Sequence, residues 1–546
     1  MIPFYIDFGC SKHQEVIPTK EIKSKRSTME TWSIVLISIS IVAFFNLLSR
    51  NFSKKLPPSP PGIPIIGHLL WLRKPYAEME IVLRNLYEKY GPMFTLYFGP
   101  KPAVFIATRS LAHEALVQNS TVFADRPPIS PITKVFTNNQ HTISFGSYGP
   151  KWRLFRRNLA SEMLSPSRIK AYSNARKWVL NILVDRLQSQ SQSGDPVCVV
   201  DHFRFSMFSL VALMCFADKL EEKQILDIEH VIRSILVNLS RFEILNYWPR
   251  LGKILFRKRW QELYQIWQDA EDVLIPLIKA RQKLKEERLN KSKSGVLPGE
   301  NKEDEHVVSY VDTLLDLQIP EENNRNLTDG EMASLCSELL DGGTGTTSTA
   351  LQWIMANLVK YPEVQEKLFM EMKKAFGDGG VEELGEEDVQ RVPYLKAVVL
   401  EGLRRHPPAH NLLPHAVTQD TMFNGFVVPK KGIVNFLVAE MGWDPKAWKD
   451  PMAFKPERFL DQGQVVFDIT GTSEIKMMPF GAGRRMCPGY HLAMLHLEYF
   501  VANLVWKFQW KAVEGDNVSL AEKEEFTIPM KYPLKAHLSP RVCEEK

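Results

Sequence analysis

The stretch Pro-Phe-Gly-Ala-Gly-Arg-Arg-Met-Cys-Pro-Gly, at residues 479–489, decides how the rest of the chain is interpreted. It places Cys487 in a turn, with Gly483 and Gly489 on either side and Arg485 two residues upstream, and a helical pattern follows. A cysteine thiolate can ligate haem iron, and N–H groups at a helix start stabilise it. Glycines let a flat macrocycle approach, and an arginine fork suits a haem propionate. The spacing predicts an iron-thiolate site; the alternative is a structural cysteine in a glycine-rich loop.

Composition narrows the class of protein. The chain has 546 residues, of which 45% are hydrophobic and 24% charged, enough for a large core. The formal net charge of +5 is mild, and no basic run is interleaved with aromatic residues, so we expect no nucleic-acid partner. The cysteines have no paired spacing, which is typical of a reducing compartment rather than a disulfide framework.

The pattern Phe480-x-x-Gly483-x-Arg485-x-Cys487-x-Gly489 resembles the haem-binding signature of the cytochrome P450 family, and it lies near the C-terminus as in that family. The resemblance extends over about residues 56–540. It implies a mainly α fold with small β-sheets, the cytochrome P450-like haem-thiolate fold, preceded by one N-terminal transmembrane helix. It also implies haem b, with Cys487 as the axial metal ligand and the other four residues as cofactor-binding. In detail the chain looks like a plant microsomal member, most similar to family eighty-nine, subfamily A.

The N-terminal region predicts a membrane anchor. Residues 31–49 contain an apolar run long enough to span a bilayer; a cleaved signal peptide is the rival, but no clear small-x-small site ends the run. Residues 1–30 are interpreted as an extension, with Met29 as an alternative start. Residues 50–64 are basic and proline-rich, which predicts a stiff hinge with the following domain on the cytosolic side. Residues 65–546 are then the catalytic haem domain.

Two further motifs predict cofactor contacts. Trp152-x-x-x-Arg156 puts an indole and a guanidinium on one helical face; a stacked surface pair is the simpler alternative, whereas the resemblance implies contact with the haem propionates. Lys151, Arg153 and Arg157 on the same helix are interpreted as a cationic docking patch for an electron donor. His415 matches a family position that bonds a propionate. Glu401-x-x-Arg404, together with Arg458, matches the family's buried structural network and is described further below.

The distal side is expected in the helical stretch at residues 339–349. No Gly-Lys-Ser/Thr follows, so a phosphate loop is excluded. The resemblance implies that Thr346 and Thr347 are catalytic and that Gly343 lies at the cofactor. Glycines inside a helix cost about 1 kcal/mol each relative to alanine, and we expect a local helix distortion there. Gly345 occupies the position of the family's acid, so the usual acid–alcohol pair is incomplete.

These features predict a membrane-anchored haem-thiolate monooxygenase of the endoplasmic reticulum, single-pass, with a cytosolic catalytic domain. It would use electrons from NADPH-cytochrome P450 reductase and insert one oxygen atom from O2 into a lipophilic small molecule held in an apolar pocket. The alternatives are a reductase-independent haem-thiolate isomerase or dehydratase, which Gly345 keeps open, and a catalytically impaired haem-binding membrane protein. Members of the resembling group and its neighbours are associated with chlorophyll-catabolite deformylation and with fatty-acid hydroxylation, and the sequence does not choose between them.

Overall fold

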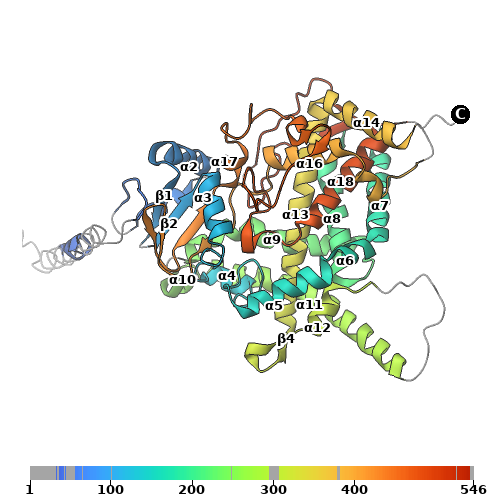
Figure 1. Ribbon diagram of the computed structural model, residues 1–546. Helices are drawn as coiled ribbons and strands as arrows, with labels where there is room; N and C mark the ends of the chain where they lie inside the picture. The colour runs from blue at the N-terminus through green and yellow to red at the C-terminus, as the bar shows by residue number, and fades with distance from the viewer. Residues whose placement is uncertain are drawn as a thin grey trace, which may run out of the picture.

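A computed structural model describes most of the chain, and helices dominate it. Figure 1 shows α13 (Asp329–Lys360) running through the middle of a helical body, with a small sheet at one side next to α2 (Tyr76–Tyr90) and α3 (Arg109–His113). The described residues are 32–33, 36–41, 44, 56–63, 66–74, 76–99, 101–246, 249–293, 307–377, 381–523 and 525–541.

The predicted N-terminal segments are mostly beyond what the structure describes. The extension at residues 1–30 lies outside the described residues, as does most of the predicted anchor at 31–49, of which 32–33, 36–41 and 44 are described as helical. Within the described part of the chain, one helix is long and apolar enough to cross a membrane, α8 (Val199–Phe216). Because 78% of that stretch is buried inside the protein, α8 is a core helix.

The remaining helices surround α13 and α8. They are α4 (Pro131–Phe136), α5 (Pro150–Asn158), α6 (Pro166–Ala171), α7 (Ser173–Ser191), α9 (Glu222–Phe242), α10 (Pro249–Leu255), α11 (Arg257–Lys293), α12 (Tyr310–Leu315), α14 (Pro362–Phe376), α15 (Glu386–Val389), α16 (Pro393–Arg405), α17 (Val438–Gly442) and α18 (Tyr490–Lys507). Several of them, α5 and α16 included, begin with a proline, whose missing N–H costs nothing at the first helical position.

The strands form small sheets, as predicted. The largest has the order β1-β2-β9-β6, in which β1 and β2 are antiparallel and β2 and β9 are parallel. Its strands are β1 (Met93–Phe98), β2 (Lys101–Ile106), β9 (Ile433–Phe436) and β6 (His415–Ala416). A second sheet has the order β12-β13-β3, with β12 (Phe508–Ala512), β13 (Lys535–Pro540) and β3 (Val197–Cys198). Two-stranded pairs are made by β4 (Gln318–Ile319) with β5 (Arg325–Asn326), β7 (Thr421–Phe423) with β8 (Phe426–Val428), and β10 (Leu460–Asp461) with β11 (Gln464–Val465).

The central helix α13 starts at a capping box and is continuous. The Thr328 hydroxyl accepts a hydrogen bond from the Glu331 N–H, and the Glu331 carboxylate accepts one from the Thr328 N–H, which satisfies two N–H groups of the first turn. The expected distortion at the glycines is wrong, because residues 342–346 are regular α-helix. Gly343 has a packing reason instead: a Cβ there would lie 3.1 Å from Val211 Cγ2 on α8.

Candidate active site

The loop that carries Cys487 is held by its own backbone. The Cys487 N–H donates to the Phe480 carbonyl at 2.8 Å, which closes the turn between the two residues. Gly483 has a φ of +68°, and a Cβ there would overlap the carbonyl oxygen of Leu116, so glycine is required. Gly489 has no such constraint: its φ is −91° and a Cβ would meet nothing within 4 Å. The loop leads directly into α18, as predicted.

Cys487 lies in an environment that disfavours a bare thiolate. Burial raises the pKa of the Cys487 thiol, while the Gly489 N–H and the charge of Arg156 lower it. The predicted help from the following helix start is therefore present, but burial is the larger effect. A bound metal cation reverses this balance, because a coordinating thiol is deprotonated outright. The position of Cys487 therefore suits a cysteine whose thiolate is stabilised by a bound metal cation.

Three arginines converge beside this loop, of which Arg126 is buried and Arg156 and Arg485 are half-buried. Arg156 on α5 donates to the carbonyl of Met486 at 2.6 Å, next to Cys487. Arg485 donates to the carbonyls of Ala124, Ile143 and Gly146 at 2.7, 3.0 and 2.6 Å. Arg126 donates to the carbonyls of Ser144, Leu413 and Pro414 at 2.6, 2.8 and 2.9 Å. Each of the three side chains therefore links segments that are far apart in the sequence, close to the loop that carries Cys487.

The three guanidiniums are charged groups kept largely from water. Burial and the neighbouring Arg485 lower the pKa of Arg126 to about 9, and burial, with Arg156 nearby, lowers that of Arg485 to about 10. Mutual repulsion of this kind is relieved by an anionic ligand. The propionates of haem are such a ligand, and guanidinium forks match carboxylates geometrically. The donor set therefore fits haem, with Cys487 beside it.

Trp152 and His415 belong to the same cluster, but each donates a ring N–H hydrogen bond to a backbone carbonyl of the protein. The Trp152 Nε1–H donates to the Ile143 carbonyl at 2.9 Å, and Arg485 lies over the indole ring at 4.5 Å. His415 Nδ1 donates to the Phe123 carbonyl at 2.7 Å, and burial lowers its pKa to about 3. Neutral His415 therefore presents a lone pair at Nε2, and donation to a carboxylate from that atom requires the imidazolium.

The predicted distal residues lie together on α13, with one exception. Thr346 is half-buried, and its hydroxyl donates to the Gly342 carbonyl at 2.8 Å. Gly342 is exposed and Gly345 half-buried, and a Cβ on either would meet nothing within 4 Å. Most residues of α13 are buried, so Gly342, Gly345 and Thr346 form an accessible stretch on the surface of the helix, near its middle. Thr347 is only 5% exposed, so the helix brings Thr346 and not Thr347 to that face.

Comparisons with known proteins agree with this geometry. The family model for cytochrome P450 matches residues 57–536. The chain belongs to the cytochrome P450 family. Cytochrome P450 89A9 of Arabidopsis thaliana is 49% identical over 94% of this chain and 100% of its own length, which confirms the resemblance to family eighty-nine. The 5-epiaristolochene 1,3-dihydroxylase of Nicotiana tabacum is 31% identical over 94% of this chain and 99% of its own. A zebra fish cytochrome P450 structure with progesterone has a TM-score of 0.67 at 23% identity, covering 85% of this chain and 99% of that one, and shows the shared fold.

The protein is a cytochrome P450 monooxygenase, and its family implies haem b with an axial cysteine thiolate.

The predicted structural network of Glu401, Arg404 and Arg458 is confirmed. Glu401 accepts hydrogen bonds from Arg404 at 2.7 and 2.8 Å and from Arg458 Nε at 3.1 Å, and Glu401 and Arg404 are fully buried. Arg458 lies in the 3-10 helix η6 (Pro456–Phe459) and Arg404 in α16, so the network fastens these two elements of the P450 fold.

The P450 also holds two acids that sequence reasoning missed. Glu338 on α13 accepts hydrogen bonds from the N–H groups of Ile143, at 2.7 Å, and Ser144. Asp341, one turn further on, is half-buried. The signal that could have identified both is their helical spacing from Gly345, because residues three, four and seven apart share a face. The face of α13 that carries Gly345 therefore also carries two carboxyl groups.

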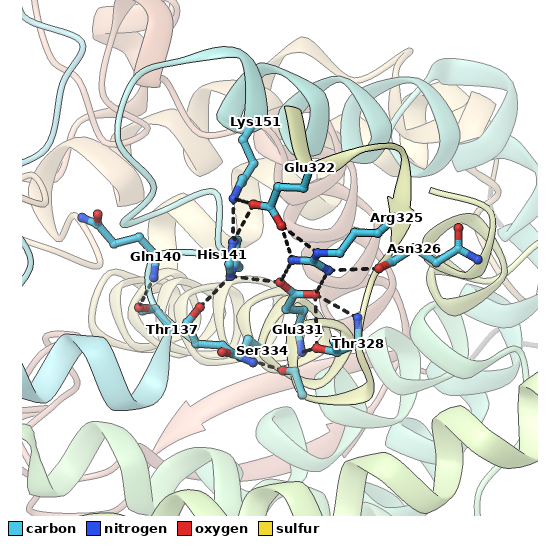
Figure 2. A network of polar contacts seen from close by, with 12 residues as sticks. Thr137, Gln140, His141, Lys151, Glu322, Arg325, Asn326, Thr328, Glu331 and Ser334 are labelled. Atoms are coloured by element: carbon cyan, nitrogen blue, oxygen red, sulfur yellow. Dashed lines mark hydrogen bonds and ion pairs between the residues drawn. The ribbon is translucent and has the colours of Figure 1, made fainter. Parts of the chain in front are cut away.

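A second polar network fixes the N-terminal end of α13 against α5 (Figure 2). Arg325 makes a bidentate pair with Glu331 at 2.7 Å to each oxygen, and Lys151 pairs with Glu322. His141 lies between them, with Nδ1 3.1 Å from Glu331 and Nε2 2.7 Å from the Lys151 ammonium. The Lys151 side chain is 30% exposed and its charge is paired with Glu322, so Lys151 is not a free cation of the predicted docking patch. Arg153 and Arg157 are exposed.

Proposed function

We propose that this P450 is membrane-anchored, accepts electrons from NADPH-cytochrome P450 reductase, and inserts one oxygen atom from O2 into a lipophilic small molecule. The observation that carries the proposal is the juxtaposition of Cys487 with Arg126, Arg156 and Arg485, a set of groups that suits one metal thiolate and two carboxylates. Exposed Arg153 and Arg157 on α5 support docking of an acidic redox partner. Family membership supports the same reaction class.

In this proposal the cofactor contacts come from both predicted and newly found residues. When bound, haem supplies the oxygen chemistry, and the axial thiolate donates electron density to the iron. Cys487 is the metal ligand, Arg156, Arg485 and Arg126 hold the propionates, and the ring of Trp152 supports Arg485. The proposal also places the other predicted cofactor-binding residues at the haem site: Gly343, His415, Phe480, Gly483 and Gly489. Thr346 orients water or substrate through its hydroxyl oxygen.

The proposed substrate is a lipophilic small molecule. Relatives with names such as costunolide synthase and 5-epiaristolochene 1,3-dihydroxylase are compatible with apolar substrates for this branch of the family. The proposed location is the endoplasmic reticulum membrane, with residues 31–49 as the single span and the domain at 65–546 in the cytosol.

The test is expression of the full chain followed by reduction and addition of carbon monoxide. A thiolate-type absorption band together with NADPH-dependent oxygenation in the presence of a plant reductase supports the proposal. Turnover with a peroxide but not with NADPH and reductase would instead establish the isomerase or dehydratase alternative, which Gly345 keeps open. A thiolate band without turnover under either condition would establish a haem-binding protein that has lost activity.

A further inference from the structure

The accessible face of α13 holds an acid one turn away from the place where the family has one. Asp341 and Gly345 are four residues apart in a regular α-helix, so their side-chain positions are neighbours on one face. Resting on the proposed function, we propose that Asp341 is the proton donor of this oxygenase, acting through a water held in the space beside Gly345.

The helix surface beside Asp341 is not filled by protein side chains. A Cβ built on Gly342 or on Gly345 meets no protein atom within 4 Å, so a water fits beside Gly345 between Asp341 and Thr346 in the proposed arrangement. Asp341 is half-buried, and within the described part of the chain its carboxyl group has no hydrogen bond or ion pair with the protein. An unpartnered carboxyl group in this position is free to bond a water.

Thr346 is oriented to hold that water without using its own proton. Its hydroxyl hydrogen is directed at the Gly342 carbonyl, at an oxygen–oxygen distance of 2.8 Å. The lone pairs of Oγ1 are therefore the part of the side chain left for a water to donate to. In the proposed transfer, the Asp341 O–H bond breaks as the water takes the proton, and the water releases one of its own toward the reacting oxygen. Asp341 is left as a carboxylate and regains its proton from solvent.

The charges around Asp341 keep its proton available near neutral pH. Burial, followed by the charge of Glu338, raises the pKa of Asp341 to about 7. Glu338 is fixed by the N–H groups of Ile143 and Ser144 and faces the cationic side chains of Arg126 and Arg156 and the hydroxyl of Tyr310. The positive charge of Arg485 also interacts with the Glu338 carboxylate. These groups connect the Cys487 side of the site with the face that carries Asp341.

The experiment uses the full-length haem-loaded protein with a plant reductase and 7-ethoxycoumarin as a neutral apolar probe, and measures NADPH, oxygen, hydrogen peroxide and product. Asp341→Asn should lower product formation, or water formation where the probe is not oxidised, by about 100-fold, the lower end of what a general acid contributes. NADPH oxidation should continue, with hydrogen peroxide approaching one per NADPH. The matched control is Asp516→Asn, the same change at an exposed site remote in sequence. Asp341→Asn/Gly345→Asp should regain at least tenfold of the lost coupling.

Two readouts separate proton donation from a structural role. In wild type, coupling should fall as pH rises through about 7, where Asp341 loses its proton, whereas Asp341→Asn should be flat. In infrared spectra of the resting protein, which need no turnover, a protonated-carboxyl band should disappear over the same range and be missing from Asp341→Asn. Unchanged coupling in Asp341→Asn, or a wild type without that band at pH 6, would overturn the inference. A wild type without a thiolate-type carbon monoxide band would overturn the proposed function instead.

Discussion

At the scale of single residues, Cys487 shows two opposing requirements. The haem iron needs a thiolate, while burial raises the pKa of the thiol. The cysteine must therefore be held where a metal can reach it, and the turn closed by the Phe480 carbonyl does this. Cys215 on α8 and Cys336 on α13 are buried in the core, where they neighbour each other.

We therefore predict that Cys487→Ser abolishes the thiolate-type carbon monoxide band and the oxygenase activity, because a serine hydroxyl does not ionise at neutral pH. Absorption spectra of the reduced protein with carbon monoxide check this directly. Cys198→Ser, at a half-buried position, and Cys336→Ser should keep both properties. A normal band in Cys487→Ser would refute the assignment of the ligand.

Gly345 is the second residue that affects the proposed reaction, because it determines how far the proton-donating acid lies from Thr346. With the acid one turn away at Asp341, transfer through water should leak, and a substantial share of NADPH should appear as hydrogen peroxide in wild type. Gly345→Asp should raise the product formed per NADPH, because an acid then lies next to Thr346 and the open space accepts the side chain. The stoichiometry of product, peroxide and NADPH measures this. Tight coupling in wild type and a fall in Gly345→Asp would contradict it.

At the scale of elements, glycines in α13 and α16 have different reasons to be there. Gly342 faces open space, whereas a Cβ on Gly402 would overlap Ile354 Cγ1, where α16 packs against α13. Gly402 lies between Glu401 and Arg404, so it also sets how closely the buried ion pair approaches α13. By helix propensity alone, alanine would be more stable than glycine at both positions. Packing makes the difference, because a Cβ is accommodated at Gly342 and not at Gly402.

Two matched variants test this difference. Gly342→Ala should raise the free energy of unfolding by about 1 kcal/mol, the propensity gain of an unobstructed alanine. Gly402→Ala should lower it by about 1–3 kcal/mol, because overpacking a buried contact exceeds that gain. Denaturant unfolding of both purified variants gives the comparison. A stabilised Gly402→Ala would mean that Ile354 moves aside at little cost.

The start of α13 depends on one carboxylate. Glu331 closes the capping box and pairs with Arg325 in a buried position. Burial alone would raise its pKa, but the hydrogen bonds from Arg325 and from the Thr328 N–H outweigh it and lower the pKa from 4.5 to about 2. A lowered folded-state pKa adds stability that is fully present above the unfolded value and is lost as pH falls toward 2.

Glu331→Gln should accordingly cost on the order of 3 kcal/mol of unfolding free energy at pH 7. The difference from wild type should shrink as pH falls from about 5 toward 2, and unfolding midpoints across that range measure it. Asp329→Asn is the control in the same turn, because its pairing with Lys279 at 3.4 Å is exposed and worth about 0–1 kcal/mol. An equal effect of the two variants at pH 7 would contradict the role of the buried pair.

At the scale of the whole molecule, local patterns were sufficient where one element carries the signal. The helix with Trp152 and Arg156 and the helix that follows Cys487 are both present where the sequence predicted a helix. Contacts between segments that are distant in the sequence could not be predicted from local patterns. Arg126 joins the arginine cluster only because 126, 144 and 413 meet in space, and Lys151 leaves the docking surface because Glu322 reaches it. The sequence does contain a signal for Asp341, its spacing of four residues from Gly345, but only the structure shows that this side chain is half-buried on the accessible face of α13.

The last prediction concerns how the molecule lies relative to the membrane. The chain has acceptor sequences for N-glycosylation at Asn326-Leu327-Thr328 and Asn517-Val518-Ser519, and both asparagines are exposed in the fold. Exposure makes them informative, because burial cannot explain a lack of modification. With residues 31–49 as a single span and the domain in the cytosol, both should remain unmodified in protein made in plant cells.

The control replaces residues 1–55 with a cleavable secretory signal, which sends the same domain into the lumen. Asn517 and Asn326 should then carry glycans, and a glycosidase should lower the apparent mass. Starting translation at Met29 should leave the full-length pattern, haem content and activity unchanged. A glycan on Asn517 or Asn326 of the full-length protein would place the catalytic domain in the lumen, away from a cytosolic reductase, and would overturn both the topology and the proposed electron donor.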